Sequence, residues 1–271
     1  MNAWSISIEH LCGGYGGRLV LEDFSAELPA GVITAILGES GCGKTTLLRF
    51  LLGLNRPVSG KIIIGGRNIC EMPQGQFRKL RRRFGVLFQD GALISSLSLR
   101  ENIALPLMEH TRLSKKVIGE AAVRTLALVG LDKFAGYYPG ELSGGMRKRA
   151  GLARAIVTEP PVLFCDEPTS GLDPVTAAQM DQLLLDMRRC YPDMTIVVVT
   201  HDLDSVRRIA DNVLVLRDKK VAFSGSLEAL DSSEDPYIRM LLDRKFVESR
   251  RMTAPPLNEE LRSALAEWLD E

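Results

Sequence analysis

The stretch GESGCGKTT, residues 38–46, joins a short apolar segment to a segment with helical periodicity. Residues 32–37 before it are β-branched or apolar almost throughout, which indicates a strand that is covered on both faces. Residues 44–52 place their apolar side chains at helical spacing. The glycines are therefore predicted to form a turn between a buried strand and a helix.

The turn matches the phosphate-binding pattern G-x-x-x-x-G-K-S/T at Gly38, Gly43, Lys44 and Thr45. Glycines let the main chain wrap closely, so that its N–H groups and the helix N-terminus point at an anion. Lys44 is expected to reach the β- and γ-phosphates of a nucleoside triphosphate, and the Thr45 hydroxyl to bind magnesium. A glycine-rich turn with a chance lysine is the alternative. The nucleotide-binding residues predicted here are Gly38, Glu39, Ser40, Gly41, Cys42, Gly43, Lys44, Thr45 and Thr46.

The composition, 45% hydrophobic and 25% charged over 271 residues, is typical of a globular protein with a substantial core. The 34 Lys and Arg residues balance the 34 Asp and Glu residues, so no nucleic-acid partner is expected. The 5 cysteines have no C-x-x-C spacing, which predicts reduced thiols in a cytosolic protein and no zinc site. Neither a secretion signal nor an apolar run of membrane-spanning length is recognised. We therefore expect another chain to cross any membrane at which this protein works.

Strand-like and helical segments alternate along the chain in a pattern that is typical of an α/β fold. Residues 1 to about 88 are rich in predicted strands, and residues from about 89 to 159 are mainly helical. Later strands, with helices between them, are predicted at residues 162–165, 195–199 and 212–216. We therefore predict a parallel-sheet core with a helical insertion, in a domain that spans about residues 1–230.

Two carboxylates, Asp166 and Glu167, follow the apolar segment 162–165. Ligands of parallel sheets lie beyond the carboxyl ends of the strands, so both side chains are expected to face the phosphate loop. Asp166 is predicted to hold magnesium, and Glu167 to accept a proton from an attacking water. An acidic pair that merely caps a helix is the alternative.

The string LSGGM, residues 142–146, is expected to open a helix that continues through the basic residues 147–149. Ser143 suits the N-cap position, and Gly144 and Gly145 would leave main-chain N–H groups open to a second anion contact. Taken alone, the string indicates only the capped start of a helix.

The order of the motifs resembles that of the nucleotide-binding subunit of an ABC transporter, over residues from about 5 to 225. The motifs are Tyr15, GESGCGKTT, Gln89 in LFQDGALI, LSGGM, VLFCDEPTSGLDP and His201 in VVVTHD. The resemblance implies an ABC-type P-loop ATPase with a RecA-like parallel-sheet core, an antiparallel β subdomain and a helical subdomain over about 89–159. It also implies that Tyr15 stacks on adenine, that Gln89 links the nucleotide site to a membrane partner, and that His201 contacts the γ-phosphate.

The same resemblance implies ATP and Mg²⁺ as cofactors and ATP hydrolysis as the activity. The implied catalytic residues are Glu167, His201 and Lys44, and the implied magnesium ligands are Thr45, Gln89 and Asp166. Two ATP molecules would close a head-to-tail homodimer, in which Ser143, Gly144 and Gly145 of one subunit cover the ATP on the other. Ser170–Asp173 would run along that interface. The further partner implied is an integral membrane permease, which would place the chain at the cytoplasmic face of the inner membrane.

The signature ends in Met146, where the family usually has a glutamine that can hydrogen-bond a ribose or phosphate. LSGGM resembles the ATPases of MCE-linked lipid transporters, which include the Mla phospholipid system and its plant and actinobacterial relatives. Residues 88–111, FQDGALISSLSLRENIALPLMEHT, resemble the same subfamily. This second resemblance favours phospholipid transport between membranes, with an MCE-domain substrate-binding protein and a small STAS-type accessory subunit as partners.

Other interpretations stay open at this point. An iron–sulfur cluster assembly ATPase has an equally short core and needs no permease. A binding-only regulator conflicts with the joint presence of Lys44, Asp166, Glu167 and His201. Tyr15 could instead pack on its own strand, and His201 could be a surface histidine near the start of a helix.

The residues from about 231 to 271 are predicted to form an extension that the shared ATPase motifs do not require. After the pair Pro255-Pro256, Asn258 can cap a terminal helix over 258–269. The apolar face of this helix would be formed by Leu261, Ala264, Leu265, Trp268 and Leu269. Because so short a helix is marginal in water, we expect it to dock on a neighbouring ATPase subunit, on an accessory subunit or on its own core.

Overall fold

The computed structural model describes residues 3–243, 258–259, 261–262 and 267–268. The chain falls into two compact units, Met1–Ser233 and Glu234–Glu271. The first unit holds both sheets and the helices α1 to α8, and the second holds α9 (Pro236–Leu242). Within the described ranges, no helix combines the length and the apolar character that a membrane span needs.

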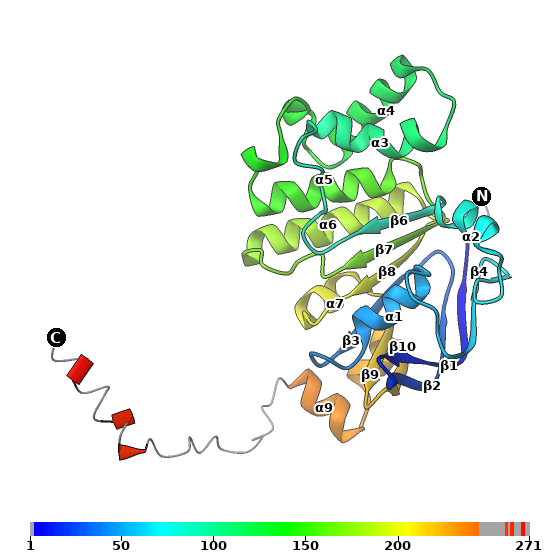
Figure 1. The fold of residues 1–271 in the computed structure, drawn as a ribbon, viewed down its shortest axis with the longest axis vertical. Helices are drawn as coiled ribbons and strands as arrows, with labels where there is room; N and C mark the ends of the chain where they lie inside the picture. The colour runs from blue at the N-terminus through cyan, green and yellow to red at the C-terminus, as the bar shows by residue number, and fades with distance from the viewer. Residues whose placement is uncertain (1–2, 244–257, 260, 263–266, 269–271) are drawn as a thin grey trace. The chain divides into compact units, whose positions relative to one another are not determined.

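Six strands form the central sheet of the first unit (Figure 1). The strands from β9 to β6 pair in parallel, and β10 pairs antiparallel with β9 at one edge. Every residue of β3 and β8 is buried, as expected for central strands that are covered on both faces. In sheet order the strands are β10 (Lys220–Ser226), β9 (Asn212–Arg217), β3 (Ile33–Gly38), β8 (Thr195–Val199), β7 (Val162–Asp166) and β6 (Phe84–Leu87).

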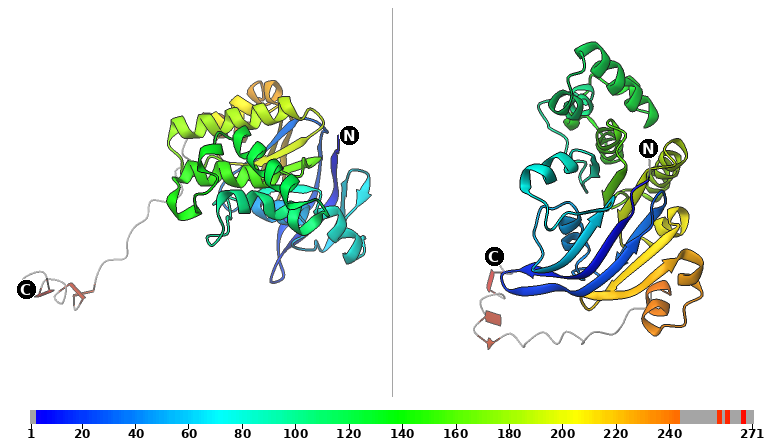
Figure 2. Two further views of the ribbon diagram at one scale, coloured as in Figure 1. Left: turned by 90° about the horizontal axis from the view of Figure 1, so that it is seen from above. Right: turned by 90° about the vertical axis from the view of Figure 1, so that its right-hand side faces the viewer.

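A second sheet has four strands, all antiparallel to their neighbours. Its longest strands, β1 and β2, form the blue hairpin of Figure 2. Gly16 and Gly17 have positive φ values of 55° and 79° and form the two-residue turn that joins the paired residues Tyr15 and Arg18. In sheet order the strands are β2 (Arg18–Leu28), β1 (Ile6–Tyr15), β4 (Ser59–Ile64) and β5 (Arg67–Asn68).

Side-chain caps begin most of the helices. Ser98 and Glu101 form a capping box at the start of α3, in which each side chain accepts a hydrogen bond from the main-chain N–H of the other. Helices α3, α4 and α5 pack together as the helical insertion, with α3 and α4 lying beyond α5 in Figure 1. The helices of the first unit are α1 (Lys44–Leu51), α2 (Gln74–Arg81), α3 (Leu99–His110), α4 (Lys115–Leu128), α5 (Gly144–Ile156), α6 (Pro174–Cys190), α7 (Leu203–Ile209) and α8 (Leu227–Asp231), with 3-10 turns at Asp132–Phe134 and Pro139–Glu141.

The central sheet separates two hydrophobic clusters. Ile196 and Val198 of β8 belong to the cluster that includes α3 to α6. Val197 and Val199, which alternate with them, belong to the cluster that includes α1 and the antiparallel sheet. The two-residue repeat of a strand produces this alternation, and the two clusters hold the carboxyl ends of the central strands in place.

The predicted α/β fold is confirmed, with its parallel core sheet, antiparallel sheet and helical insertion. In the predicted terminal helix, Asn258 Oδ1 accepts a hydrogen bond from Leu261 N at 2.8 Å, as a capping residue does. The described residues Glu259, Leu261, Arg262, Glu267 and Trp268 are helical. The other tail residues singled out from the sequence, Pro255, Pro256, Ala264, Leu265 and Leu269, lie outside the described residues.

Phe164 tests this account of the core. Its ring is fully buried in β7 and packs edge-to-face on Phe84, with ring centroids 5.6 Å apart. Truncation to alanine removes the ring and leaves a cavity beside Phe84. Phe164→Ala is therefore expected to lower the free energy of unfolding by about 3–5 kcal/mol. Val58, which is 77% exposed, is the control, and Val58→Ala should stay within about 0.5 kcal/mol of wild type. Urea unfolding measures both variants, and equal losses would contradict the assignment of the core.

Candidate nucleotide site

The phosphate loop joins β3 to α1, as the sequence predicts. Gly43 is the N-cap of α1, has a φ of 114° that suits glycine, and supplies no side-chain cap. The first N–H groups of α1 therefore lack a side-chain acceptor and are oriented to bind an anion. Among the other loop residues, Glu39, Ser40, Gly41 and Thr45 are exposed, Cys42 is half-buried, and Gly38 and Thr46 are buried.

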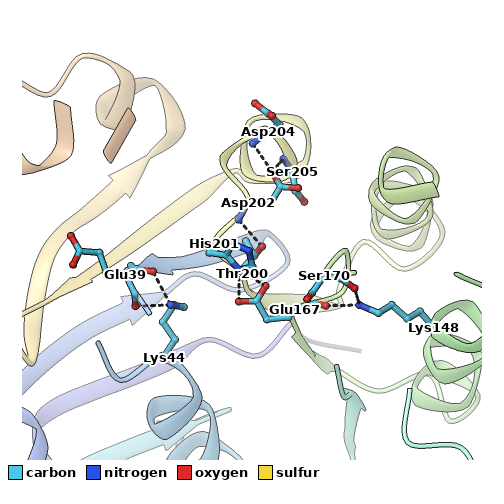
Figure 3. A network of polar contacts seen from close by, with 11 residues as sticks. Glu39, Lys44, Lys148, Glu167, Ser170, Thr200, His201, Asp202, Asp204 and Ser205 are labelled. Atoms are coloured by element: carbon cyan, nitrogen blue, oxygen red, sulfur yellow. Dashed lines mark hydrogen bonds and ion pairs between the residues drawn. The ribbon is translucent and has the colours of Figure 1, made fainter. Parts of the chain in front are cut away.

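Lys44 is held tightly over this loop. Its side chain is largely buried, and Nζ donates to the main-chain oxygens of Gly38 at 2.7 Å and Glu39 at 2.9 Å (Figure 3). An ammonium group has three protons, so one donor stays available beside the helix N-terminus. The loop thus combines a fixed positive charge with open main-chain N–H groups.

Asp166 ends β7 at the same level of the sheet as Val199 of β8 and Ile36 of β3. Burial raises the pKa of the Asp166 carboxyl above its usual range, and the neighbouring charge of Glu167 raises it further. Arg49 and Lys44 act in the opposite direction. Asp166 therefore lies near Lys44 of the phosphate loop and Arg49 of α1 and beside the second carboxylate, where a further cation would favour its charged form.

Glu167 and His201 form the closest pair of titratable groups at the carboxyl ends of the central strands. The ring Nδ1 of His201 lies 3.0 Å from Glu167 Oε1, within hydrogen-bond geometry, and 2.9 Å from Oε2. Oε2 is buried and has no hydrogen-bond partner among the described residues. A carboxylate beside a histidine, with one oxygen that is not fully hydrogen-bonded, is suited to accept a proton from a water molecule.

The turn after β8 places His201 beside Glu167 (Figure 3). Thr200 Oγ1 accepts a hydrogen bond from Asp202 N at 3.0 Å, and the Asp202 side chain caps α7. Glu167 directly follows β7, and its N–H donates a hydrogen bond to the carbonyl oxygen of Val199 in β8 at 2.8 Å. The structure therefore brings Lys44, Asp166, Glu167 and His201 together at the carboxyl ends of the central strands.

The other predicted site residues lie on separate elements. Tyr15 is at the end of the β1–β2 hairpin and is 41% exposed, so its ring is open to a stacking partner. Gln89 is exposed on the loop after β6. Ser143 is exposed at the start of α5, where its Oγ accepts a hydrogen bond from Met146 N at 3.2 Å.

Met146, whose apolar side chain departs from the glutamine that the resemblance leads one to expect, has a packing role. Its half-buried side chain packs against the hydrophobic cluster that includes α3 to α6. The apolar residue at this position is therefore compatible with its surroundings. At the N-terminus of α5, Ser143 and Gly144 are exposed, and position 146 adds no polar side chain beside them.

Sequence reasoning missed Lys148, which was predicted only to lie in the helix that begins after Ser143 and was given no role. The side chain is 5% exposed, and Nζ donates to Glu167 O at 2.9 Å and Ser170 O at 2.6 Å. Helical spacing offered a signal, because Lys148 shares a face with Gly145 and Gly151, both of which are buried in close contacts.

A family model described as "ABC transporter" matches residues 21–170. The chain belongs to the ABC transporter family. The probable ribonucleotide transport ATP-binding protein mkl of Mycobacterium tuberculosis is 43% identical over 94% of this chain and 70% of its own length. The intermembrane phospholipid transport system ATP-binding protein MlaF of Escherichia coli K12 is 42% identical over 84% of each chain.

Solved structures of ABC ATPases have the same fold. The post-hydrolysis dimer of the ATP-binding cassette MJ0796 bound to ADP and Pi matches with a TM-score of 0.75 and 30% identity, over 82% of this chain and 98% of that one. The structure of cbiO1 from Clostridium perfringens, part of the ABC transporter complex cbiONQ, matches with a TM-score of 0.79 and 30% identity, over 89% and 96%. The chain is thus an ATP-binding subunit of the ABC type, and its enzymatic activity is ATP hydrolysis.

Gly145 tests the packing that positions the start of α5. A Cβ at this position would lie 2.5 Å from Thr176 Cγ2, and Thr176 is itself fixed by a 2.6 Å hydrogen bond from its hydroxyl to Asp173. Overpacking of about 1–3 kcal/mol exceeds the helix propensity gained, so Gly145→Ala is expected to lower the free energy of unfolding. A Cβ at Gly144 would meet its nearest neighbour only at 4.0 Å, so Gly144→Ala should be neutral or stabilising. Equal urea midpoints for the two variants would contradict this packing.

Proposed function

We propose that the chain is the ATP-hydrolysing subunit of a transporter that moves phospholipid between membranes. The observation that carries this proposal is the 42% identity over 84% of each chain with MlaF, a protein named for intermembrane phospholipid transport. The mycobacterial relative is named for ribonucleotide transport, so the ATPase core alone does not distinguish the cargo. LSGGM and residues 88–111 favour lipid. Because these relatives are transport proteins by name, a permease-linked ATPase is favoured over an iron–sulfur cluster assembly ATPase.

The residues of the site support ATP with Mg²⁺ as its cofactor. Oxygen donors suit Mg²⁺, and Thr45, Gln89 and Asp166 would supply them. Beside them, Glu167 Oε2 is buried and makes no hydrogen bond within the described part of the chain. The bound ion would neutralise charge on the β- and γ-phosphates. Lys44 and the N–H groups of α1 hold the phosphates, Tyr15 stacks on adenine, and His201 contacts the γ-phosphate. Glu167 takes the proton of the attacking water.

A second copy of the chain completes the site in this proposal. Ser143 and Gly144 lie exposed at the N-terminus of α5, on a different element from the phosphate loop. In a head-to-tail homodimer these residues and Gly145 would cover the ATP on the phosphate loop of the other subunit, with Ser170–Asp173 along the interface. The dimeric MJ0796 cassette bound to ADP and Pi supports this arrangement. ATP binding closes the dimer and hydrolysis opens it.

An integral membrane permease is the proposed partner that crosses the membrane, and it holds this chain at the cytoplasmic face of the inner membrane. The loop after β6 carries the exposed apolar residues Phe88 and Ile94, 39% and 40% exposed, beside Gln89. These side chains suit a short permease helix. An MCE-domain protein and a STAS-type accessory subunit are the further proposed partners, and Trp268, which is 69% exposed, would dock the terminal helix on such a subunit or on the second ATPase.

Two variants separate the chemical step from binding. Glu167→Gln removes the proton acceptor, so ATP hydrolysis is expected to fall by roughly 10²- to 10⁴-fold while ATP binding is kept. Lys44→Ala removes the positive charge over the loop, so ATP binding itself should weaken. Steady-state ATPase assays and equilibrium binding of a fluorescent ATP analogue measure both. Near-normal turnover of Glu167→Gln would refute Glu167 as the base.

Co-purification tests the membrane partner. Full-length chain recovered from native membranes is expected to bring a permease and an MCE-domain protein, identified by mass spectrometry. Ile94→Glu should reduce the recovered permease at least about tenfold, a loss of ~1.4 kcal/mol or more, with ATP binding intact. Val123→Glu is the matched control, because Val123 is also 40% exposed but lies on α4. Recovery of a soluble iron–sulfur assembly complex, or equal loss in both variants, would contradict the proposal.

A further inference from the structure

Lys148 is the buried cation that the proposed mechanism does not use. Its side chain is 5% exposed, and its Nζ bridges the main-chain oxygens of Glu167 and Ser170, at 2.9 Å and 2.6 Å (Figure 3). Burial lowers the pKa of the Lys148 ammonium, whereas the nearby carboxylates of Asp90 and Glu167 raise it. A buried charge is costly unless it is hydrogen-bonded, so both carbonyl contacts are needed to keep the ammonium there.

The main chain that Lys148 holds is in an unusual conformation. Glu167 has a φ of 49°, in the left-handed region that non-glycine residues rarely adopt. Its N–H is fixed by Val199 O at 2.8 Å, and its carbonyl oxygen accepts from Lys148 Nζ and from Ser170 N, the latter at 3.2 Å. These contacts restrain the peptide groups on both sides of the Glu167 Cα, and so they set the direction in which the carboxylate points.

Helix α5, which carries Lys148, is also tied to the loop that contains Gln89 and Asp90. Arg154 donates to Ala92 O at 2.8 Å and to Gly91 O at 3.0 Å. Gly151 lies against the same loop, since a Cβ there would be 2.8 Å from Gly91 Cα. The same loop also lies against the first half of α5, since a Cβ at Gly91 would be 2.8 Å from Arg147 O. One helix therefore contacts both the loop after β6 and the main chain of Glu167.

We propose that Lys148 is a positioning residue for ATP hydrolysis, which couples the placement of α5 to the aim of the Glu167 carboxylate. Lys148 does not touch the reacting atoms; it fixes the peptide groups of Glu167 and Ser170. A shift of α5 relative to β7 stretches these contacts and turns the carboxylate away from its position beside His201. The inference rests on the proposed role of Glu167 as the base.

Substitution of Lys148 should lower turnover without lowering nucleotide affinity. Lys148→Met keeps the length of the side chain and removes its donors, so kcat is expected to fall about 10- to 100-fold, as for a misplaced catalytic group. The KM for ATP and the affinity for a fluorescent ATP analogue should stay within about threefold of wild type, because the phosphate loop is unchanged. Lys148→Arg retains the charge and the donors and should restore most of kcat. Lys116→Met, at an exposed lysine of α4, is the matched control with wild-type turnover.

The double variant Lys148→Met, Glu167→Gln shows whether Lys148 acts through Glu167. Single-turnover hydrolysis of the double variant should be within about threefold of Glu167→Gln alone, because groups that act as a unit are not additive. An equal fold-loss in both backgrounds would overturn the inference. If Lys148→Met does not bind ATP, Lys148→Gln carries the test, because its side chain is one atom shorter and has no positive charge. If the Lys148→Met variant has a near-normal kcat while the Glu167→Gln variant is inactive, only the inference about Lys148 is refuted. If the Glu167→Gln variant is active, the proposed role of Glu167 as the base is refuted.

Discussion

The parallel pairing of β3, β8 and β7 is the constraint on which the rest of the site depends. Their register puts Ile36, Val199 and Asp166 at one level, so the loops that follow the three strands leave the sheet side by side. A slip of one residue would turn every buried side chain of a strand to the opposite face. Because both faces of these strands are packed in hydrophobic clusters, the core fixes the register and the register fixes the site.

The charged groups at the carboxyl ends of these strands are held in place by contacts within the protein. Lys44 is held by two carbonyl oxygens, and Glu167 is held through its main chain and by His201. Groups that are oriented in advance need no reorganisation when charge develops on the phosphates. Burial and the neighbouring carboxylate of Glu167 raise the pKa of the Asp166 carboxyl, so a cation bound there would favour its charged form.

Sequence patterns were most informative where a residue type has a local physical reason. The phosphate loop, the carboxylates after an apolar strand and the cap at Ser143 were all predicted from short stretches, and the α/β fold followed from the order of strands and helices. The contacts of Lys148 were not predictable in this way, because its partners lie 19 and 22 residues further along the chain and are main-chain oxygens. The packing of Met146 and the left-handed conformation of Glu167 also depend on tertiary neighbours, which a single sequence does not show.

The central claim is that each chain supplies half of a nucleotide site that ATP completes by joining two copies. Analytical ultracentrifugation of Glu167→Gln at saturating ATP and Mg²⁺ tests it directly, because this variant should bind ATP without consuming it. The account predicts a shift from monomer to dimer with ATP, no shift with ADP, and no shift when Lys44→Ala is added. A chain that stays monomeric while ATP binding is demonstrably saturated would contradict it.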